Sequence, residues 1–167
     1  MLSLMLVFVT VFSAVSCGGG LVTHKESGLI YKLPKDMKKG NVVENIADFY
    51  YSNSERVEFF WYSVPRDALV AQFSLDADCT AEEFAIDYTV YIDIFADIGE
   101  ITKTVDESGN VSQYYLLDDE EEHYFYFDYV TRSTDFVYHV TMACAPEDKE
   151  TYLPVFEKWA SYIKISE

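Results

Sequence analysis

The sequence predicts an α+β domain built from a single antiparallel β-sheet with two packed helices. Several short segments alternate aromatic or β-branched residues with polar ones, as half-buried strands do, and two other segments carry apolar residues at helical spacing. Their order along the chain is strands, helix, a meander of strands, helix and a final strand. The composition agrees, since 50% of the 167 residues are hydrophobic and 17% are aromatic, which excludes a disordered chain.

Four strands are predicted in the first half of the domain. The first is Gly28–Leu33, which ends at Pro34 because proline cannot donate to a strand ladder. The others are residues 47–52, 57–64 and 69–75. The last of these has the alternation of a strand, with one face formed by Leu69, Ala71, Phe73 and Leu75.

The clearest helix begins after Thr80. Thr80 and Glu83 form a capping box, in which each side chain satisfies a free backbone donor at the helix start. Gly99 marks the end, so we expect a helix over residues 80–98. Its apolar face is wide enough to lie across a sheet and comprises Phe84, Tyr88, Tyr91, Phe95 and Ile98, with Ile86, Val90 and Ile94 beside them.

The second half of the domain predicts a meander followed by a second helix. The meander strands are residues 101–105, 111–117, 123–130 and 136–143. The helix is expected over residues 152–162, with Thr151 as its cap and Pro154 in its first turn, where backbone donors are unpaired. A short strand at residues 163–165 ends the domain.

The N-terminus predicts export and lipid anchoring. Residues 1–16 carry no charge and form an apolar run shorter than the ~20 residues of a membrane-spanning helix, as in a secretory signal peptide. The stretch Ser13–Cys17 resembles a bacterial lipobox, which predicts a lipidated Cys17. Residues 17–27 are then a flexible tether, and residues 28–167 form one domain. The predicted location is the extracytoplasmic face of the cell membrane, held there by the lipid anchor.

Lipidation of Cys17 leaves two further cysteines, Cys79 and Cys144. An even pair of cysteines in an oxidising compartment indicates a disulfide, which would link the start of the first helix to the end of the last long strand. Two buried free thiols are the alternative, because sequence spacing does not show whether the two Cα atoms come within bridging distance.

Charge is distributed unevenly along the chain. The 12 basic and 29 acidic residues give a net charge of −17, which excludes nucleic acid as a partner because phosphate repels such a chain. The segment from Cys17 to Gly40 carries five lysines against two acids, a charge of +3, and it adjoins the predicted anchor. We therefore expect Lys35, Lys38 and Lys39 to contact an anionic membrane surface. The alternative is a loop that its lysines merely keep solvated.

The sequence contains no recognised catalytic or cofactor motif. Nucleophile elbows, phosphate-binding loops and zinc-protease or redox motifs are absent, so we predict a non-enzymatic protein with no cofactor. The alternatives are an envelope hydrolase that uses scattered carboxylates and a weak divalent-cation binder at the acidic turn 118–122. His123 and His139 are not expected to share a metal ion, since pairing Val130 with Asp135 in the hairpin separates them by three residues.

Tyrosines are the other candidate binding residues. Tyr114, Tyr124, Tyr126 and Tyr138 are predicted to face solvent in part, and exposed aromatic patches favour a peptide or glycan ligand. The predicted partner is therefore an envelope protein, a peptide or a glycan. The alternative is that helices cover this face of the sheet.

Two stretches resemble known families. The run Ser27–Pro34, a glycine followed by a strand and Leu-Pro, resembles the opening of the PsbP-like fold, which a photosystem II extrinsic subunit, a nuclear Ran-binding import factor and the bacterial DcrB lipoproteins share. The stretch from Val140 to Ile165 is similar to small secreted lipoproteins of Firmicutes, through Met142–Cys144, Tyr152, Pro154, Phe156, Lys158–Ala160 and Ile163. The resemblance implies a PsbP-like domain and no catalytic residue. We therefore predict a lipid-anchored binding or assembly module.

Overall fold

The computed structural model describes residues 20–41, 47–93, 96–118 and 123–166. The predicted signal segment and the predicted lipidation site Cys17 lie outside these residues. The helices of the described chain are α1 (Leu69–Phe73), α2 (Ala81–Asp93) and α3 (Lys149–Ala160). The strands are β1 (Leu21–Glu26), β2 (Leu29–Pro34), β3 (Lys38–Lys39), β4 (Phe49–Ser52), β5 (Glu58–Pro65), β6 (Asp97–Ile98), β7 (Thr102–Val105), β8 (Val111–Asp118), β9 (His123–Arg132), β10 (Phe136–Cys144) and β11 (Lys164–Ile165).

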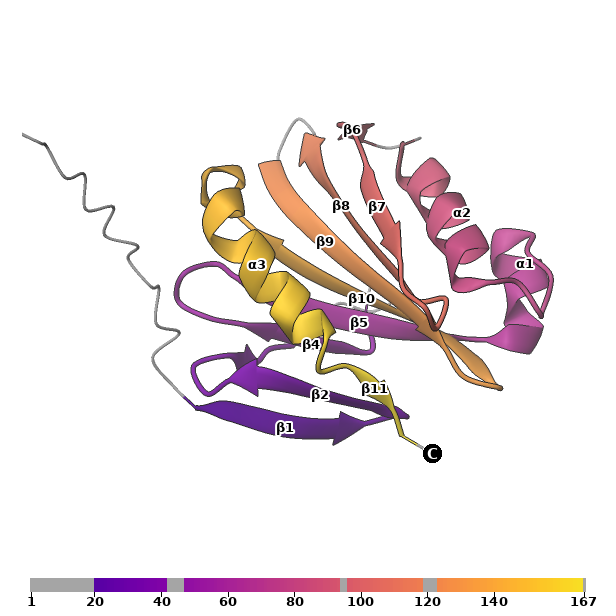
Figure 1. The fold of residues 1–167 in the computed structure, drawn as a ribbon, viewed down its shortest axis with the longest axis horizontal. Helices are drawn as coiled ribbons and strands as arrows, with labels where there is room; N and C mark the ends of the chain where they lie inside the picture. The colour runs from indigo at the N-terminus through magenta and orange to yellow at the C-terminus, as the bar shows by residue number, and fades with distance from the viewer. Residues whose placement is uncertain (1–19, 42–46, 94–95, 119–122, 167) are drawn as a thin grey trace, which may run out of the picture.

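The strands form two antiparallel sheets, so the prediction of a single sheet with two helices is wrong in detail although the α+β class is confirmed (Figure 1). The large sheet has the order β3-β4-β5-β10-β9-β8-β6, with β7 also paired to β8, and the small sheet has the order β1-β2-β11. The second sheet exists because residues 21–26, predicted as tether, fold back on β2. The two-residue turn Ser27–Gly28 has positive φ at both positions (42° and 89°), the geometry of a tight hairpin.

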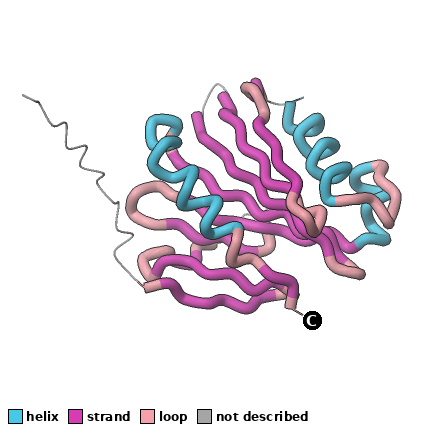
Figure 2. Tube along the Cα trace, in the orientation of Figure 1, coloured by secondary structure: helices cyan, strands magenta, loops and turns pink. Residues whose placement is uncertain are grey.

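The large sheet separates two hydrophobic clusters. Along β9, Phe125 and Phe127 belong to the cluster beneath α3, whereas Val130 belongs to the cluster beneath α1 and α2. The small sheet covers the same face as α3 and lies beside it, as Figure 2 shows. It contributes the inward side chains of β2, which are Leu29, Tyr31 and Leu33. The molecule therefore has three layers, with the large sheet in the middle.

The predicted strand over residues 69–75 is wrong. A 3-10 turn (Arg66–Ala68) leads into α1, in which Leu69 is buried, Val70 is exposed and Phe73 is half-buried. Leu69 and Phe73 are four residues apart and therefore share a helical face. The apolar pattern of residues 69–75 fits both a strand and a helix. The packing of α1 beside α2 favours the helix.

Both predicted helices exist, but their ends differ. The capping box of α2 is confirmed, with the Thr80 backbone N–H donating to Glu83 Oε2 (2.7 Å) and the Glu83 N–H donating to Thr80 Oγ1 (3.1 Å). The far end of the predicted helix is instead strand β6, Asp97–Ile98, paired with β8. Helix α3 begins three residues earlier than predicted and is preceded by Asp148, so Thr151 is not its cap.

No helix of the described residues is long and apolar enough to cross a membrane.

Candidate functional site

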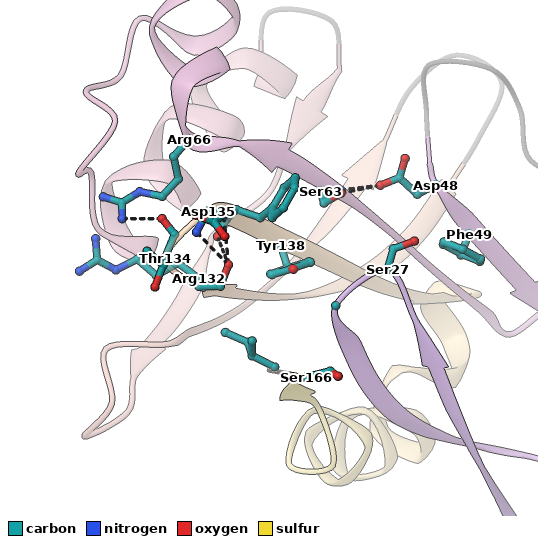
Figure 3. A pocket seen from close by; sticks show the side chains of 14 residues that line it. Ser27, Asp48, Phe49, Ser63, Arg66, Arg132, Thr134, Asp135, Tyr138 and Ser166 are labelled. Atoms are coloured by element: carbon teal, nitrogen blue, oxygen red, sulfur yellow. Dashed lines mark hydrogen bonds between the residues drawn. The ribbon is translucent and has the colours of Figure 1, made fainter.

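A groove of about 1220 Å³ opens where the small sheet meets the end of the large sheet (Figure 3). Its walls come from the β1–β2 turn, the end of β11, the start of β4 and the adjoining ends of β5, β9 and β10. Hydroxyl groups, carboxylates, two arginines and aromatic rings line it together. The lining residues are Ser27, Gly28, Asp48, Phe49, Ser63, Arg66, Arg132, Ser133, Thr134, Asp135, Phe136, Tyr138, Ile165 and Ser166.

The β1–β2 turn forms one wall of the groove, and its shape depends on Gly28. Gly28 has a φ of 89°, and a Cβ at this position would overlap the Tyr138 Oη from β10. Only glycine combines this backbone conformation with such a close approach. The small sheet is thereby held against the large sheet at the groove.

Asp48 covers the edge of β5 where β4 has not yet begun. Its Oδ2 accepts hydrogen bonds from the Ser63 backbone N–H (2.8 Å) and from Ser63 Oγ (2.9 Å). The Asp48 backbone N–H donates to the Trp61 carbonyl (2.9 Å). These contacts fix the carboxylate at the groove wall, and they block another strand from pairing at Ser63.

Two of the three arginines in the sequence, Arg66 and Arg132, lie at the opposite end of the groove (Figure 3). Arg66 donates to the carbonyls of Thr134 (3.1 Å) and Ala77. Arg132 donates to the carbonyls of Asp78 (3.0 Å) and Cys79 (2.8 Å). Both guanidinium groups therefore attach the loop before α2 to the sheet. A guanidinium carries five N–H donors, so each arginine keeps donors for an anionic ligand.

The groove also contains an open strand edge. Among the strands that the structure describes, β11 pairs with β2 alone, and Ile165 of β11 lines the groove. Phe136 and Tyr138, with ring centroids 6.0 Å apart, form an aromatic wall. This combination of an edge, hydroxyl groups and charges of both signs suits an extended polar ligand.

The predicted disulfide does not form in the structure. Cys79 and Cys144 are both free and buried, and the large sheet lies between them, since Cys79 belongs to the cluster beneath α2 and Cys144 to the cluster beneath α3. Burial raises the pKa of the Cys79 thiol above its ordinary value and that of Cys144 to about 12. Both are thus packed thiols of low reactivity.

The three predicted membrane-contact lysines are all exposed, and their local contacts differ. The Lys35 side chain lies beside Gly20, whereas Lys38 is exposed on β3. Lys39 pairs with Glu26 (Nζ–Oε1 2.9 Å) and lies 4.2 Å from the centroid of an aromatic ring, that of Phe49.

A different set of lysines is brought together on the outer face of the small sheet. Lys25 of β1 and Lys164 of β11 both pair with Ile30 of β2, and Lys32 projects from the same face two residues further along. The strand residues of this face include no acid. We call Lys25, Lys32 and Lys164 the basic face.

The predicted tyrosine surface is not assembled. Tyr138 is buried in the cluster beneath α3, and Tyr114 lies on the same side of the sheet with Lys149 5.3 Å from its ring centroid. Tyr124 and Tyr126 are half-buried on the opposite face. The large sheet therefore lies between Tyr114 and Tyr138 on one face and Tyr124 and Tyr126 on the other.

The predicted hairpin register is wrong, because Val130 pairs with His139 and not with Asp135. His139 pairs with Val130 because β9 continues to Arg132 before the turn. His123 pairs with Asp118 on β8, and its Nδ1 lies 2.8 Å from an Asp118 carboxylate oxygen. The remainder of the predicted acidic turn, residues 119–122, lies outside the described residues.

Two polar groups, the half-buried Glu26 and the fully buried Asp128, were not predicted from the sequence. Glu26 accepts hydrogen bonds from Tyr31 and Tyr51 as well as from Lys39. Burial alone would raise the pKa of Glu26, but these bonds and the Lys39 charge bring it below its ordinary value. The sequence of β1 does not indicate these contacts of Glu26, because a short segment that follows three glycines is typical of a flexible tether.

The second group lies beneath α2. Asp128 is fully buried and accepts hydrogen bonds from Thr141 Oγ1 (2.8 Å) and Tyr115 Oη (2.9 Å), and its Oδ1 lies 3.2 Å from His139 Nε2. A signal existed here, since Asp128 interrupts the most aromatic strand of the sequence at an alternating position. An acid in such a strand needs a buried partner.

Comparisons with known proteins relate this chain to others through its fold. No protein-family model matches it, and a search of curated proteins found no match. The solution structure of cyanobacterial PsbP (CyanoP) from Synechocystis sp. PCC 6803 matches with a TM-score of 0.62 at 13% identity, over 87% of this chain and 92% of that one. The crystal structure of LpqN, involved in cell envelope biogenesis of Mycobacterium tuberculosis, matches with a TM-score of 0.57 at 8% identity, over 89% of this chain and 90% of that one. The predicted PsbP-like fold is therefore confirmed.

Proposed function

We propose that this chain is a lipid-anchored, non-enzymatic binding protein on the extracytoplasmic face of the membrane, and that its groove takes an extended peptide from an envelope partner. The observation that carries the proposal is the groove between the two sheets, bounded by the open edge of β11 and lined by both hydroxyl groups and arginines. LpqN, which has a similar fold, is involved in cell envelope biogenesis, and this agrees with an envelope setting.

A peptide suits this groove better than a glycan does. The backbone of an extended peptide can hydrogen-bond to an open strand edge, which a sugar lacks the geometry to copy. The edge is short, so side-chain contacts with the Phe136–Tyr138 wall supply the remaining affinity. Arg66 and Arg132 favour an acidic side chain or a terminal carboxylate at their end of the groove.

The anchor is tested by fractionation. Cys17→Ser removes the sulfur that would carry the lipid, and we expect the protein to move from the membrane to the soluble or secreted fraction. The matched control is Cys79→Ser, which alters a buried cysteine away from the anchor. Membrane association that persists in Cys17→Ser would contradict the lipoprotein proposal.

The groove is tested by photo-cross-linking in intact cells. A benzoylphenylalanine replaces Phe136, which lines the groove, and in the control it replaces Thr151, which is exposed on α3. We expect one protein to be cross-linked at position 136 only, with the adduct mapping to a single peptide. Ser166→Trp, which fills the groove, should abolish the adduct. The same adducts at both positions would overturn the proposal, and a carbohydrate adduct at 136 would replace peptide by glycan.

The basic face supports a defined orientation on the membrane. It lies on β1, β2 and β11, and β1 begins only four residues after Cys17 (21 − 17), a reach of at most about 14 Å. We propose that Lys25, Lys32 and Lys164 face the anionic lipid surface while the acidic bulk of the protein faces away.

A further inference from the structure

A second cavity lies on the other face of the large sheet, between β5 and the helices α1 and α2. It has a volume of about 650 Å³. Four aromatic side chains dominate its wall, and we call it the tyrosine cavity. They are Tyr62 from β5, Phe73 from α1, and Tyr88 and Tyr91 from α2.

Tyr62, one of the residues that line the tyrosine cavity, carries a polar group without a partner. The Tyr62 Oη is buried and has no hydrogen-bond partner among the described residues. The rings of Tyr62 and Tyr88 have centroids 6.2 Å apart, and both pack against the buried imidazole of His139, at 5.1 Å and 4.1 Å. A buried hydroxyl without a partner destabilises the empty protein, so a ligand that hydrogen-bonds to it gains affinity.

The charge at the cavity is negative. Asp48 lies at its rim, where Ser63 holds the carboxylate in place through two hydrogen bonds. The described residues that line the cavity include no lysine, arginine or histidine. The surrounding protein has a net charge of −17, which adds a field that attracts cations.

We propose that the tyrosine cavity binds a small quaternary ammonium compound that also carries a hydroxyl or carbonyl group. Several aromatic faces around one space attract a methylated ammonium group through their negative quadrupoles, and such a group is too weakly hydrated to resist entry. The Asp48 carboxylate is the counter-charge, and the Tyr62 Oη bonds to the polar group of the ligand. A metal ion would find one carboxylate here, too few oxygen ligands to hold it.

This inference does not rest on the peptide groove. The two cavities lie on opposite faces of β5 and share only Asp48 and Ser63. Tyr88 and Tyr91 contact the tyrosine cavity alone, whereas Ser166 contacts the groove alone, so the two proposals can be tested by separate variants.

The test compares choline with its neutral isostere 3,3-dimethylbutan-1-ol by calorimetric titration of the full chain carrying Cys17→Ser. The two probes have the same shape and the same hydroxyl, and only choline is charged. We expect saturable binding of choline that is about tenfold or more tighter than binding of the isostere. Equal affinity for both probes, or no saturable binding of choline, would overturn the proposal.

Two variants assign the binding to this cavity. Asp48→Asn removes the charge and keeps the shape, and Tyr91→Leu removes one aromatic wall from a side chain that is 55% exposed, so neither empties the core. We expect each to weaken choline binding about tenfold, with Tyr124→Leu, a half-buried tyrosine on β9, as the unaffected control. Ser166→Trp should also leave choline binding unchanged. Undiminished binding in both Asp48→Asn and Tyr91→Leu would place the ligand elsewhere and contradict the assignment.

Discussion

At the scale of single residues, the contact between Gly28 and Tyr138 joins the two sheets. Gly28→Ala adds a methyl group that overlaps the Tyr138 Oη and places alanine at a φ of 89°. We expect a loss of about 3 kcal/mol in the free energy of unfolding, measured by urea denaturation, from backbone strain and overpacking together. Gly109→Ala is the matched control, because Gly109 has a similar φ of 79° with nothing within 4 Å, and it should lose only about 1 kcal/mol. Equal losses would show that Tyr138 simply moves away.

The buried pair Asp128 and His139 makes the large sheet sensitive to acid. Burial tends to raise the pKa of Asp128, but the adjacent His139 and the hydrogen bonds from Thr141 and Tyr115 bring that pKa below its ordinary value of 3.8. The ionised carboxylate therefore stabilises the fold fully at a pH above 3.8. This stabilisation is lost as the pH falls through the lowered pKa of the folded state.

We expect Asp128→Asn to reduce the free energy of unfolding at neutral pH by about 3 kcal/mol or more, since it leaves His139 buried without its charged partner. The difference from the wild type should shrink as the pH falls below about 4, because the wild type then loses the same interaction. Asp135→Asn, at an exposed carboxyl, should change stability by no more than about 0.5 kcal/mol. A difference between Asp128→Asn and the wild type that stays constant from neutral to acid pH would contradict this account.

At the scale of elements, α3 contains a proline that removes one of the backbone hydrogen bonds of the helix. Pro154 lies inside the helix and is exposed, and it lacks the N–H that would donate to the Glu150 carbonyl. Tyr152, Phe156 and Trp159 nevertheless bury the inner face of α3 against the large sheet. The helix thus persists because packing outweighs its local propensity.

Pro154→Ala restores the missing donor, and we expect it to raise the free energy of unfolding by about 1–3 kcal/mol. Thr151→Ala, at another exposed position of α3, is the control for the added alanine and should change stability far less. Thermal unfolding measures both. A loss of stability in Pro154→Ala would mean that α3 must bend at Pro154 to place its buried face.

At the scale of the whole molecule, the basic face lies on the small sheet, whose first strand β1 follows the proposed anchor in the chain. Replacing Lys25, Lys32 and Lys164 by Gln removes the basic face, and we expect weaker binding of the unlipidated chain to vesicles that contain anionic lipid at low salt. The difference should fade as added salt shortens the Debye length to about 10 Å and below. Vesicle sedimentation measures both effects.

The matched control for the basic face replaces Lys38, Lys103 and Lys149, which changes the charge by the same amount at positions outside that face. Equal weakening in the two triple variants would show that net charge alone matters. Absence of vesicle binding by the unlipidated wild type at low salt would contradict the proposed orientation.

Much of the fold could be predicted from local patterns, for identifiable reasons. The capping box of Thr80 and Glu83 located the start of α2, because its two hydrogen bonds connect residues only three positions apart. The long strands β5, β8, β9 and β10 were recognisable because their period-2 alternation extends over eight or more residues. By contrast, residues 69–75 satisfied two periodicities at once, and the short strand β1 lies in a segment whose glycines indicate a coil.

The sequence by itself determined the α+β class, the longer elements and the excess of acid, because each depends on composition or on neighbours a few residues apart, and its resemblance to the PsbP-like fold pointed to the domain type. Only the tertiary structure decided the second sheet, the separation of Cys79 from Cys144, the basic face, the groove and the tyrosine cavity. Each of these depends on which elements lie side by side. That choice rests on long-range packing between residues far apart in the chain, such as Gly28 against Tyr138, and no local period records it.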